Sequence, residues 1–72
     1  MRTIKANEVF QTPVPEIGVT LDSTPATLYY SADGETWTAW SENITDNNVV
    51  ISGIPGGLFL KLNVACKITE KW

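Results

Sequence analysis

The sequence predicts an all-β protein, a small single-domain antiparallel sandwich or barrel of about six to seven strands with an extended N-terminal arm. Turn signals recur about every 8–12 residues, which is the spacing found in sandwiches and small barrels. The runs between the turns are rich in β-branched and aromatic residues. Near the C-terminus, Leu58, Leu60 and Leu62 alternate with other residue types, and no helical period extends over a useful length.

Each strand is expected between two turn signals. Asp33-Gly34 is the sharpest hairpin signal, because a two-residue primed turn needs positive φ at both central positions. We therefore expect a two-residue turn at Asp33-Gly34 that joins two paired strands. The expected strands are residues 17–21, 27–31, 36–40, 49–52, 58–63 and 65–69, with residues 9–12 as a further candidate.

The chain length limits how much stability the core can supply. A chain of 72 residues forms one domain and buries only about 60% of its unfolded surface. Cys66 is the single cysteine and histidine is absent, so an internal disulfide is excluded and a zinc site is disfavoured. We expect no cofactor and no metal. A partner subunit remains as the additional source of stability, and we expect a homo-oligomer or a protein present in many copies.

Residues 1–16 differ from residues 17–72, which we assign to the sandwich or barrel domain. Pro13 and Pro15 cannot donate ladder hydrogen bonds, and few large apolar residues surround them. Two interpretations stay open, a frayed terminus and an extended arm that docks on a neighbouring subunit. Both predict few contacts with the rest of the chain, so that deletion of residues 1–16 would spare the fold.

The charges are separated along the sequence. The net charge is −3, and all five Lys and Arg residues lie outside the segment from Ala6 to Leu60. Nucleic-acid binders show basic stripes with interleaved aromatics, whereas the aromatic-rich middle of this chain is acidic, so nucleic-acid binding is disfavoured. No apolar run is long enough for a secretion signal or a membrane span.

The residue types also argue against an enzyme. Without histidine, the common form of a catalytic triad is impossible. Asp33 and Glu35 flank the expected hairpin tip, where both carboxylates are solvated. Cys66 lies in an expected strand, and a small buried thiol is the expected role there.

The aromatic hairpin is the most informative segment. It places Tyr29, Tyr30, Trp37 and Trp40 on two adjacent strands. Trp37 and Trp40 are three residues apart and are expected on opposite faces unless a bulge intervenes. One Trp is then expected in the core and the other at the surface. Three interpretations stay open: aromatic pairs that stabilise the sheet, a contact surface for a protein partner, and a surface for a sugar ring.

Two resemblances involve this hairpin. The run from Ser31 to Trp37 resembles the Asp-box of sialidase-type propellers but lacks one residue between Asp33 and Gly34, and it occurs once, so a propeller is excluded. From Thr27 onward, the chain resembles short all-β accessory proteins of tailed bacteriophages, including those of crAss-like phages. They often carry a Tyr-Ser-x-Asp-Gly-x-x-Trp hairpin like Tyr30 to Trp37, followed by a Gly-rich loop and a Lys-Leu strand like Gly56 to Leu62.

The phage resemblance implies a virion structural protein, such as a capsid decoration, capsid accessory or head-fibre subunit, that is made in the host cytoplasm and binds a capsid or other virion protein. A carbohydrate- or ligand-binding module that uses the aromatic hairpin is the alternative, and a cytoplasmic interaction domain or inhibitor is a third class. If the terminal segments meet, their basic residues and Trp72 would form a basic end. The expected partner-binding residues are Arg2, Lys5, Tyr29, Trp37, Trp40, Lys71 and Trp72.

Overall fold

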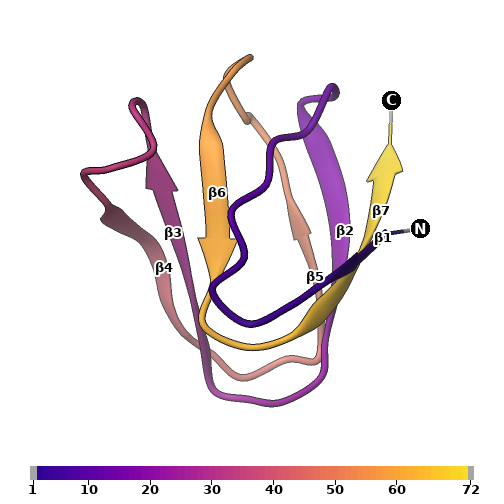
Figure 1. The fold of residues 1–72 in the computed structure, drawn as a ribbon. Coiled ribbons are helices and arrows are strands. Elements are labelled where there is room, and N and C mark those ends of the chain that lie inside the picture. Colours follow the sequence, from indigo (N-terminus) through magenta and orange to yellow (C-terminus); the bar gives the residue numbers. More distant parts are fainter. Residues whose placement is uncertain (1, 72) are drawn as a thin grey trace.

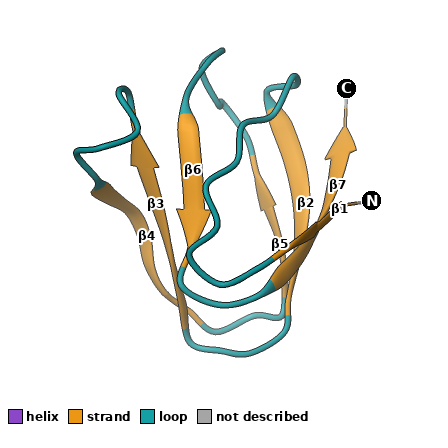
Figure 2. Ribbon diagram, viewed as in Figure 1, coloured by secondary structure: helices purple, strands orange, loops and turns teal. Residues whose placement is uncertain are grey.

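The protein is a two-layer β-sandwich (Figures 1 and 2). A computed structural model describes residues 2–71, with side chains for residues 2–70. Its four-stranded sheet has the order β1-β7-β2-β5 and its three-stranded sheet the order β4-β3-β6. All neighbouring strands are antiparallel, and the sheets do not close into a barrel within residues 2–71. The strands are β1 Arg2–Ile4, β2 Glu16–Leu21, β3 Ala26–Ser31, β4 Thr38–Ile44, β5 Asn48–Ile51, β6 Phe59–Leu62 and β7 Cys66–Lys71.

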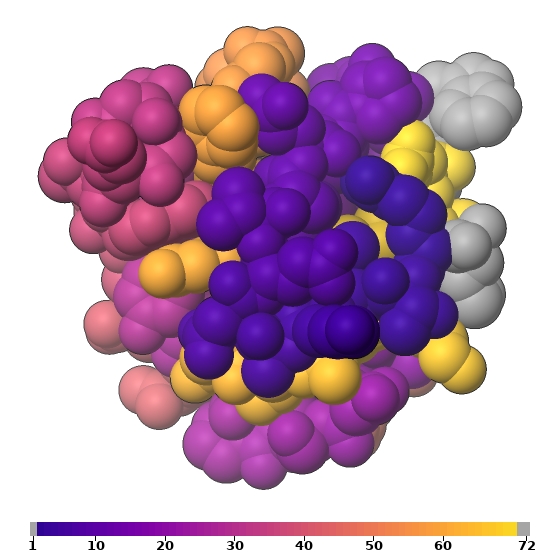
Figure 3. All heavy atoms as spheres, viewed as in Figure 1, coloured from indigo at the N-terminus to yellow at the C-terminus, as the bar shows by residue number. Residues whose placement is uncertain are grey.

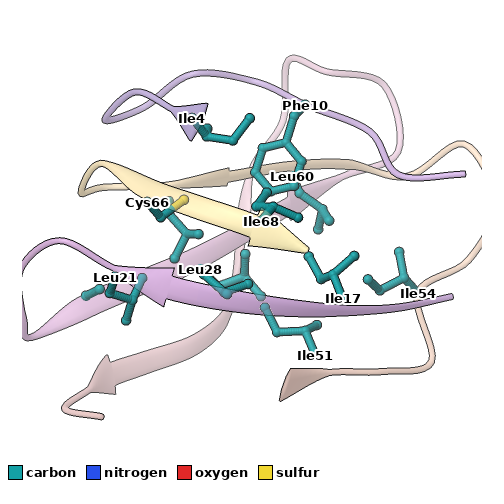
Figure 4. Close-up of a cluster of buried hydrophobic side chains, with 13 residues drawn as sticks. Ile4, Phe10, Ile17, Leu21, Leu28, Ile51, Ile54, Leu60, Cys66 and Ile68 are labelled. Carbon is teal, nitrogen blue, oxygen red and sulfur yellow. The ribbon is translucent and has the colours of Figure 1, made fainter. Parts of the chain in front are cut away.

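The core lies between the sheets because alternate residues of the inner strands point inward. Leu60 and Leu62 on β6 are fully buried. Leu60 lies beside Ile68 from the other sheet, with Ile17 near by (Figure 4). The buried apolar residues are Ile4, Phe10, Ile17, Val19, Leu21, Ala26, Leu28, Ile51, Ile54, Leu60, Leu62, Cys66 and Ile68. The all-β prediction and the expected sandwich are confirmed.

Cys66 is a structural thiol, as expected. It is 1% exposed and belongs to the core cluster. Burial raises the pKa of its thiol to about 11, with smaller contributions from the negative charges of Asp22 and Glu8. A thiol with this pKa is protonated at neutral pH and is a poor nucleophile.

The prediction that residues 1–16 make few contacts with the domain is wrong. β1 pairs with β7, and Ile4 and Phe10 are 3% and 6% exposed. Phe10 forms a bridge with Leu60 on the other sheet, so the segment crosses the side of the sandwich and joins both layers (Figures 1 and 3). Residue 16 already belongs to β2. The segment is therefore a structural part of the domain, because the core between β6 and β7 needs its two apolar side chains.

The two prolines in this segment do act as expected. Pro13 and Pro15 lie outside the strands, in the stretch between Phe10 and β2. The Pro15 carbonyl accepts a hydrogen bond of 3.0 Å from the Ile54 N–H. The further candidate strand at residues 9–12 is reduced to the single bridge at Phe10.

The expected two-residue turn at Asp33-Gly34 is also wrong. β3 and β4 pair across the turn as predicted, but residues 32–37 connect them. Gly34 has φ of 80°, whereas Asp33 does not take the positive φ that a primed turn requires, since Asn7 and Asn43 are the non-glycine residues with positive φ among those described. The Asp33 carboxylate instead accepts hydrogen bonds from the backbone within this connection. The second strand therefore begins at Thr38 and not at the expected residue 36.

Candidate protein-binding site on the three-stranded sheet

Three half-buried side chains meet on the outer face of the three-stranded sheet. The Lys61 Nζ lies 4.5 Å from the centroid of the Trp37 ring and 5.6 Å from that of the Tyr29 ring. An ammonium over aromatic faces is attracted to the π-electrons, with about 0.5–1 kcal/mol for each contact at an exposed site. We call Tyr29, Trp37 and Lys61 the Lys61 cluster.

Strand register places this cluster. Leu60 and Leu62 point into the core, so Lys61 between them points outward. β3 and β6 pair with Tyr29 opposite Lys61, which brings these two side chains onto the same face. Trp37 comes from the β3–β4 connection, just before β4, and its ring also contacts the Lys61 ammonium.

The β3–β4 connection is held by the Asp33 carboxylate. The N–H groups of Glu35 and Thr36 each donate to Asp33 Oδ1 at 2.8 Å, and the Ser31 hydroxyl donates to the same oxygen at 2.8 Å. Ser31 Oγ in turn accepts from the Gly34 N–H, also at 2.8 Å. The backbone next to Trp37 is thus fixed by side-chain hydrogen bonds rather than by a tight primed turn.

These hydrogen bonds make the turn sensitive to acid. The Thr36 and Glu35 N–H groups and the Ser31 hydroxyl lower the pKa of Asp33 from 3.8 to about 2. Because this pKa is lower in the folded state, the carboxylate stabilises the fold fully above about pH 4 and loses that contribution as the pH falls toward 2. We expect Asp33→Asn to lower the urea midpoint at pH 6, and the difference from the unmodified protein to shrink steadily below pH 4.

Glu35→Gln is the matched control, because it removes a neighbouring exposed carboxylate that forms no side-chain hydrogen bond among the described residues. At pH 6, Glu35→Gln should lower the urea midpoint less than Asp33→Asn does. A midpoint difference for Asp33→Asn that stays constant from pH 6 to pH 2 would contradict the role of the charge.

Trp40 lies at an irregular point of β4. Leu28 pairs with Ser41 and Tyr29 with Ala39, so Trp40 is an extra residue at a β-bulge. Its ring is 5.7 Å from that of Tyr30 at an angle of 83°, which is an edge-to-face contact. Trp40 remains 37% exposed and borders a hollow of about 480 Å³ with Tyr30, Ala39, Gly53, Pro55 and Leu58.

The expected division of the two tryptophans between core and surface is wrong. Trp37 is half-buried on the outer face and Trp40 is exposed at the sheet edge, so neither enters the core cluster. The bulge at Trp40 and the longer connection before Trp37 break the regular alternation on which the expectation rested. Tyr29 and Tyr30 do point to opposite faces, as expected from their adjacency, since Tyr29 contacts Lys61 whereas Tyr30 packs against the core.

The terminal strands β1 and β7 lie side by side, so the terminal segments meet as the basic-end hypothesis requires (Figure 1). Arg2 is already engaged there: its Nε lies 2.9 Å from Glu70 Oε1, and its guanidinium donates to the Gln11 carbonyl at 2.8 Å. The Lys5 side chain is exposed, and its backbone N–H binds Glu8 Oε1. The Lys71 side chain and Trp72 lie outside the described residues.

The five expected binding residues whose side chains are described therefore do not form one site. Tyr29 and Trp37 come together, Trp40 lies apart at the sheet edge, and Arg2 and Lys5 are at the β1–β7 end. Lys61 was missed, although the leucines on either side of it predict that it points outward. Its contact with Trp37 depends on long-range pairing of β3 with β6, which the sequence does not reveal.

Within residues 2–70, no group of three or more acidic, cysteine or histidine side chains is arranged to hold a metal ion. Likewise, the described part of the chain has no helix of the length and apolarity needed to cross a membrane. Comparison with models of known families, with curated proteins and with solved structures gave no match.

Proposed function

We propose that this chain is a non-catalytic structural protein of a tailed-phage particle and binds another protein of that particle through the Lys61 cluster. The observation that carries the proposal is the position of Trp37 and Tyr29, two large aromatic side chains held on an outer face although the core is complete without them. Tyr and Trp are enriched at the centres of protein interfaces, where each buries much area at a small cost in side-chain entropy.

The virion setting is proposed from the resemblance alone, and the structure shows only how the segments that carry it are arranged. The two parts of the chain that carry the resemblance are neighbours in space, since β6 pairs with β3 and the Phe59 ring lies beside Gly34 of the hairpin connection. They thus contribute to one continuous surface that includes Trp37 and Lys61. A partner surface with an apolar centre and a carboxylate near Lys61 would be complementary to it.

The test measures binding of purified variants to particles, produced without this chain, of a phage that encodes it. Trp37→Ala should weaken binding at least tenfold, because removal of an interface Trp typically costs about 2 kcal/mol or more. Thr38→Ala, an exposed neighbour on β4, is the control and should bind as the unmodified chain does. Circular dichroism would verify that both variants fold.

Two results would count against the proposal. Mass spectrometry of particles from the unmodified phage provides the first: absence of the chain from those particles would overturn the virion assignment. Unchanged binding of Trp37→Ala, with binding lost in Trp72→Ala, would move the contact to the basic end.

A carbohydrate-binding module is the second candidate, and the hollow beside Trp40 favours it. The exposed Trp40 ring and the Tyr30 ring border this hollow together with Pro55 and Leu58. A sugar ring can stack on an aromatic face of this kind while backbone groups of the loop bind its hydroxyls. Glycan binding that is lost in Trp40→Ala and retained in Trp37→Ala would select this function.

A further inference from the structure

The outer strand β5 is a regular edge strand. Among the described residues it pairs only with β2, and the register is continuous from Thr20–Asn48 to Ile17–Ile51. Its sequence, Asn48-Val49-Val50-Ile51, has no charge and no proline. Val50 is 58% exposed, the highest value among the exposed large hydrophobic residues.

The other strand edges carry features that hinder pairing with another chain. The β6 edge is covered, since Phe10 bridges to Leu60 and the Asn7 N–H binds the Leu62 carbonyl at 2.7 Å. β4 has two register shifts and a positive φ at Asn43. β1 is short and contains Arg2. β5 has none of these protections.

The backbone groups that β5 leaves free can be assigned. The Leu21 N–H donates to the Asn47 carbonyl at 2.7 Å, so this pair is hydrogen-bonded in the β2–β5 ladder. Hydrogen-bonded and non-hydrogen-bonded pairs alternate in an antiparallel ladder, which makes Val49 and Ile51 the next bonded residues. The N–H and C=O groups of Asn48 and Val50 therefore point away from β2, as do those of Ser52 if the strand geometry extends by one residue.

We propose that β5 is the docking strand for a second copy of this chain, which pairs antiparallel about a two-fold axis at Val50. This register pairs Val50 with Val50 of the second copy and Asn48 with Ser52, and these are the residues with free backbone groups. Residues directly opposite each other share a face, so the exposed valines meet on the outer face while Val49 and Ile51 extend the inner apolar row. The two four-stranded sheets become one continuous sheet.

Charge permits this pairing. The strand itself carries no charged side chain, and the nearest carboxylate along the chain, that of Asp46, lies outside β5. A contact made mainly by one strand from each copy buries less than the roughly 1,000 Å² of a stable interface. We therefore expect a dissociation constant on the order of 100 μM. Such a contact becomes important when many copies are held close together on a shared surface.

Sedimentation equilibrium between about 10 μM and 1 mM tests the proposal on the full chain. The unmodified protein should pass from monomer to dimer, whereas Val50→Lys should stay monomeric because two lysines would face each other across the axis. The matched control is Thr38→Lys, which adds the same charge to an exposed position on β4, in the other sheet. It should dimerise as the unmodified chain does.

Disulfide trapping tests the register. Val50→Cys should form a covalent dimer under mild oxidation, because Cα atoms of a bonded antiparallel pair lie about 5.5 Å apart, within disulfide range. Asn48→Cys alone should not, whereas Asn48→Cys mixed with Ser52→Cys should. Two results would overturn the proposal: a protein that stays monomeric up to 1 mM, and self-association that Val50→Lys leaves unchanged. If the protein stays monomeric, β5 remains available to an extended strand of a different protein.

Discussion

Replacing Phe10 with alanine lowers the free energy of unfolding by about 3–5 kcal/mol, the usual range for a buried Phe. Phe10 is 6% exposed, joins the two sheets through Leu60 and carries the Arg2 guanidinium 5.8 Å from its ring centroid. Domains have about 0.05–0.15 kcal/mol of stability per residue, so a chain of 72 residues has about 4–11 kcal/mol in total. The substitution thus removes a large part of the stability of the domain.

Urea unfolding followed by far-ultraviolet circular dichroism measures this loss. Val9→Ala is the control, because Val9 is the chain neighbour of Phe10 but is 47% exposed. Its free energy of unfolding should change by less than about 0.5 kcal/mol, as at other surface positions. A loss below about 1 kcal/mol for Phe10→Ala would contradict the view that this segment completes the core.

Local sequence signals predicted most of the strands. The expected strands at residues 17–21 and 27–31 match β2 and β3 to within one residue, and alternating leucines marked β6. These signals work because side-chain alternation and turn chemistry act over a few neighbouring residues. The same information predicted a sandwich or a barrel, since a sheet with one apolar face must pack against a second layer or close on itself.

The N-terminal segment could not be predicted in this way. β1 contains one buried side chain, Ile4, and Phe10 lies between the exposed Val9 and the polar Gln11, so neither gives a periodic pattern. Their positions depend on β7 and β6, which lie about 50 residues or more away along the chain. The two prolines correctly predicted that no β-strand hydrogen bonds form at Pro13 and Pro15. A segment that lacks such hydrogen bonds can still supply side chains to the core.

The candidate site was predicted in part for a similar reason. The hairpin and its aromatic residues were found from local sequence, and Tyr29 and Trp37 do share a site. The position of Trp40 follows from a bulge in β4, and the inclusion of Lys61 follows from the β3–β6 register. Both depend on how separate strands pair, and one residue of shift would place either side chain on the other face.

The Lys61 cluster and β5 lie on different sheets, so one copy can use both surfaces at once. A protein that binds a particle through the three-stranded sheet would leave the β5 edge free for its neighbour. The two proposals can therefore be refuted independently. Trp37→Ala tests binding to the particle, and Val50→Lys tests self-association.

Deletion of residues 1–15 should leave the chain unfolded at 25 °C. The deletion removes β1, exposes the β7 edge and takes Ile4 and Phe10 out of the core. Loss of the two side chains alone costs about 1.5–3 kcal/mol each, and the cavity beside Leu60 and Leu62 adds to this cost. With the lost β1–β7 pairing added, the sum is comparable with the lower part of the roughly 4–11 kcal/mol expected for a domain of this size.

Circular dichroism and the dispersion of amide proton resonances would report the unfolded state, and a complementation experiment identifies its cause. A synthetic peptide of residues 1–15, added in excess, should restore dispersed resonances because it can pair with β7 and refill the core. The same peptide with Phe10→Ala should restore far less, since it keeps the β1 pairing but leaves the core open. A truncated chain that unfolds cooperatively at the urea midpoint of the full-length protein would instead return this segment to the role of a dispensable arm.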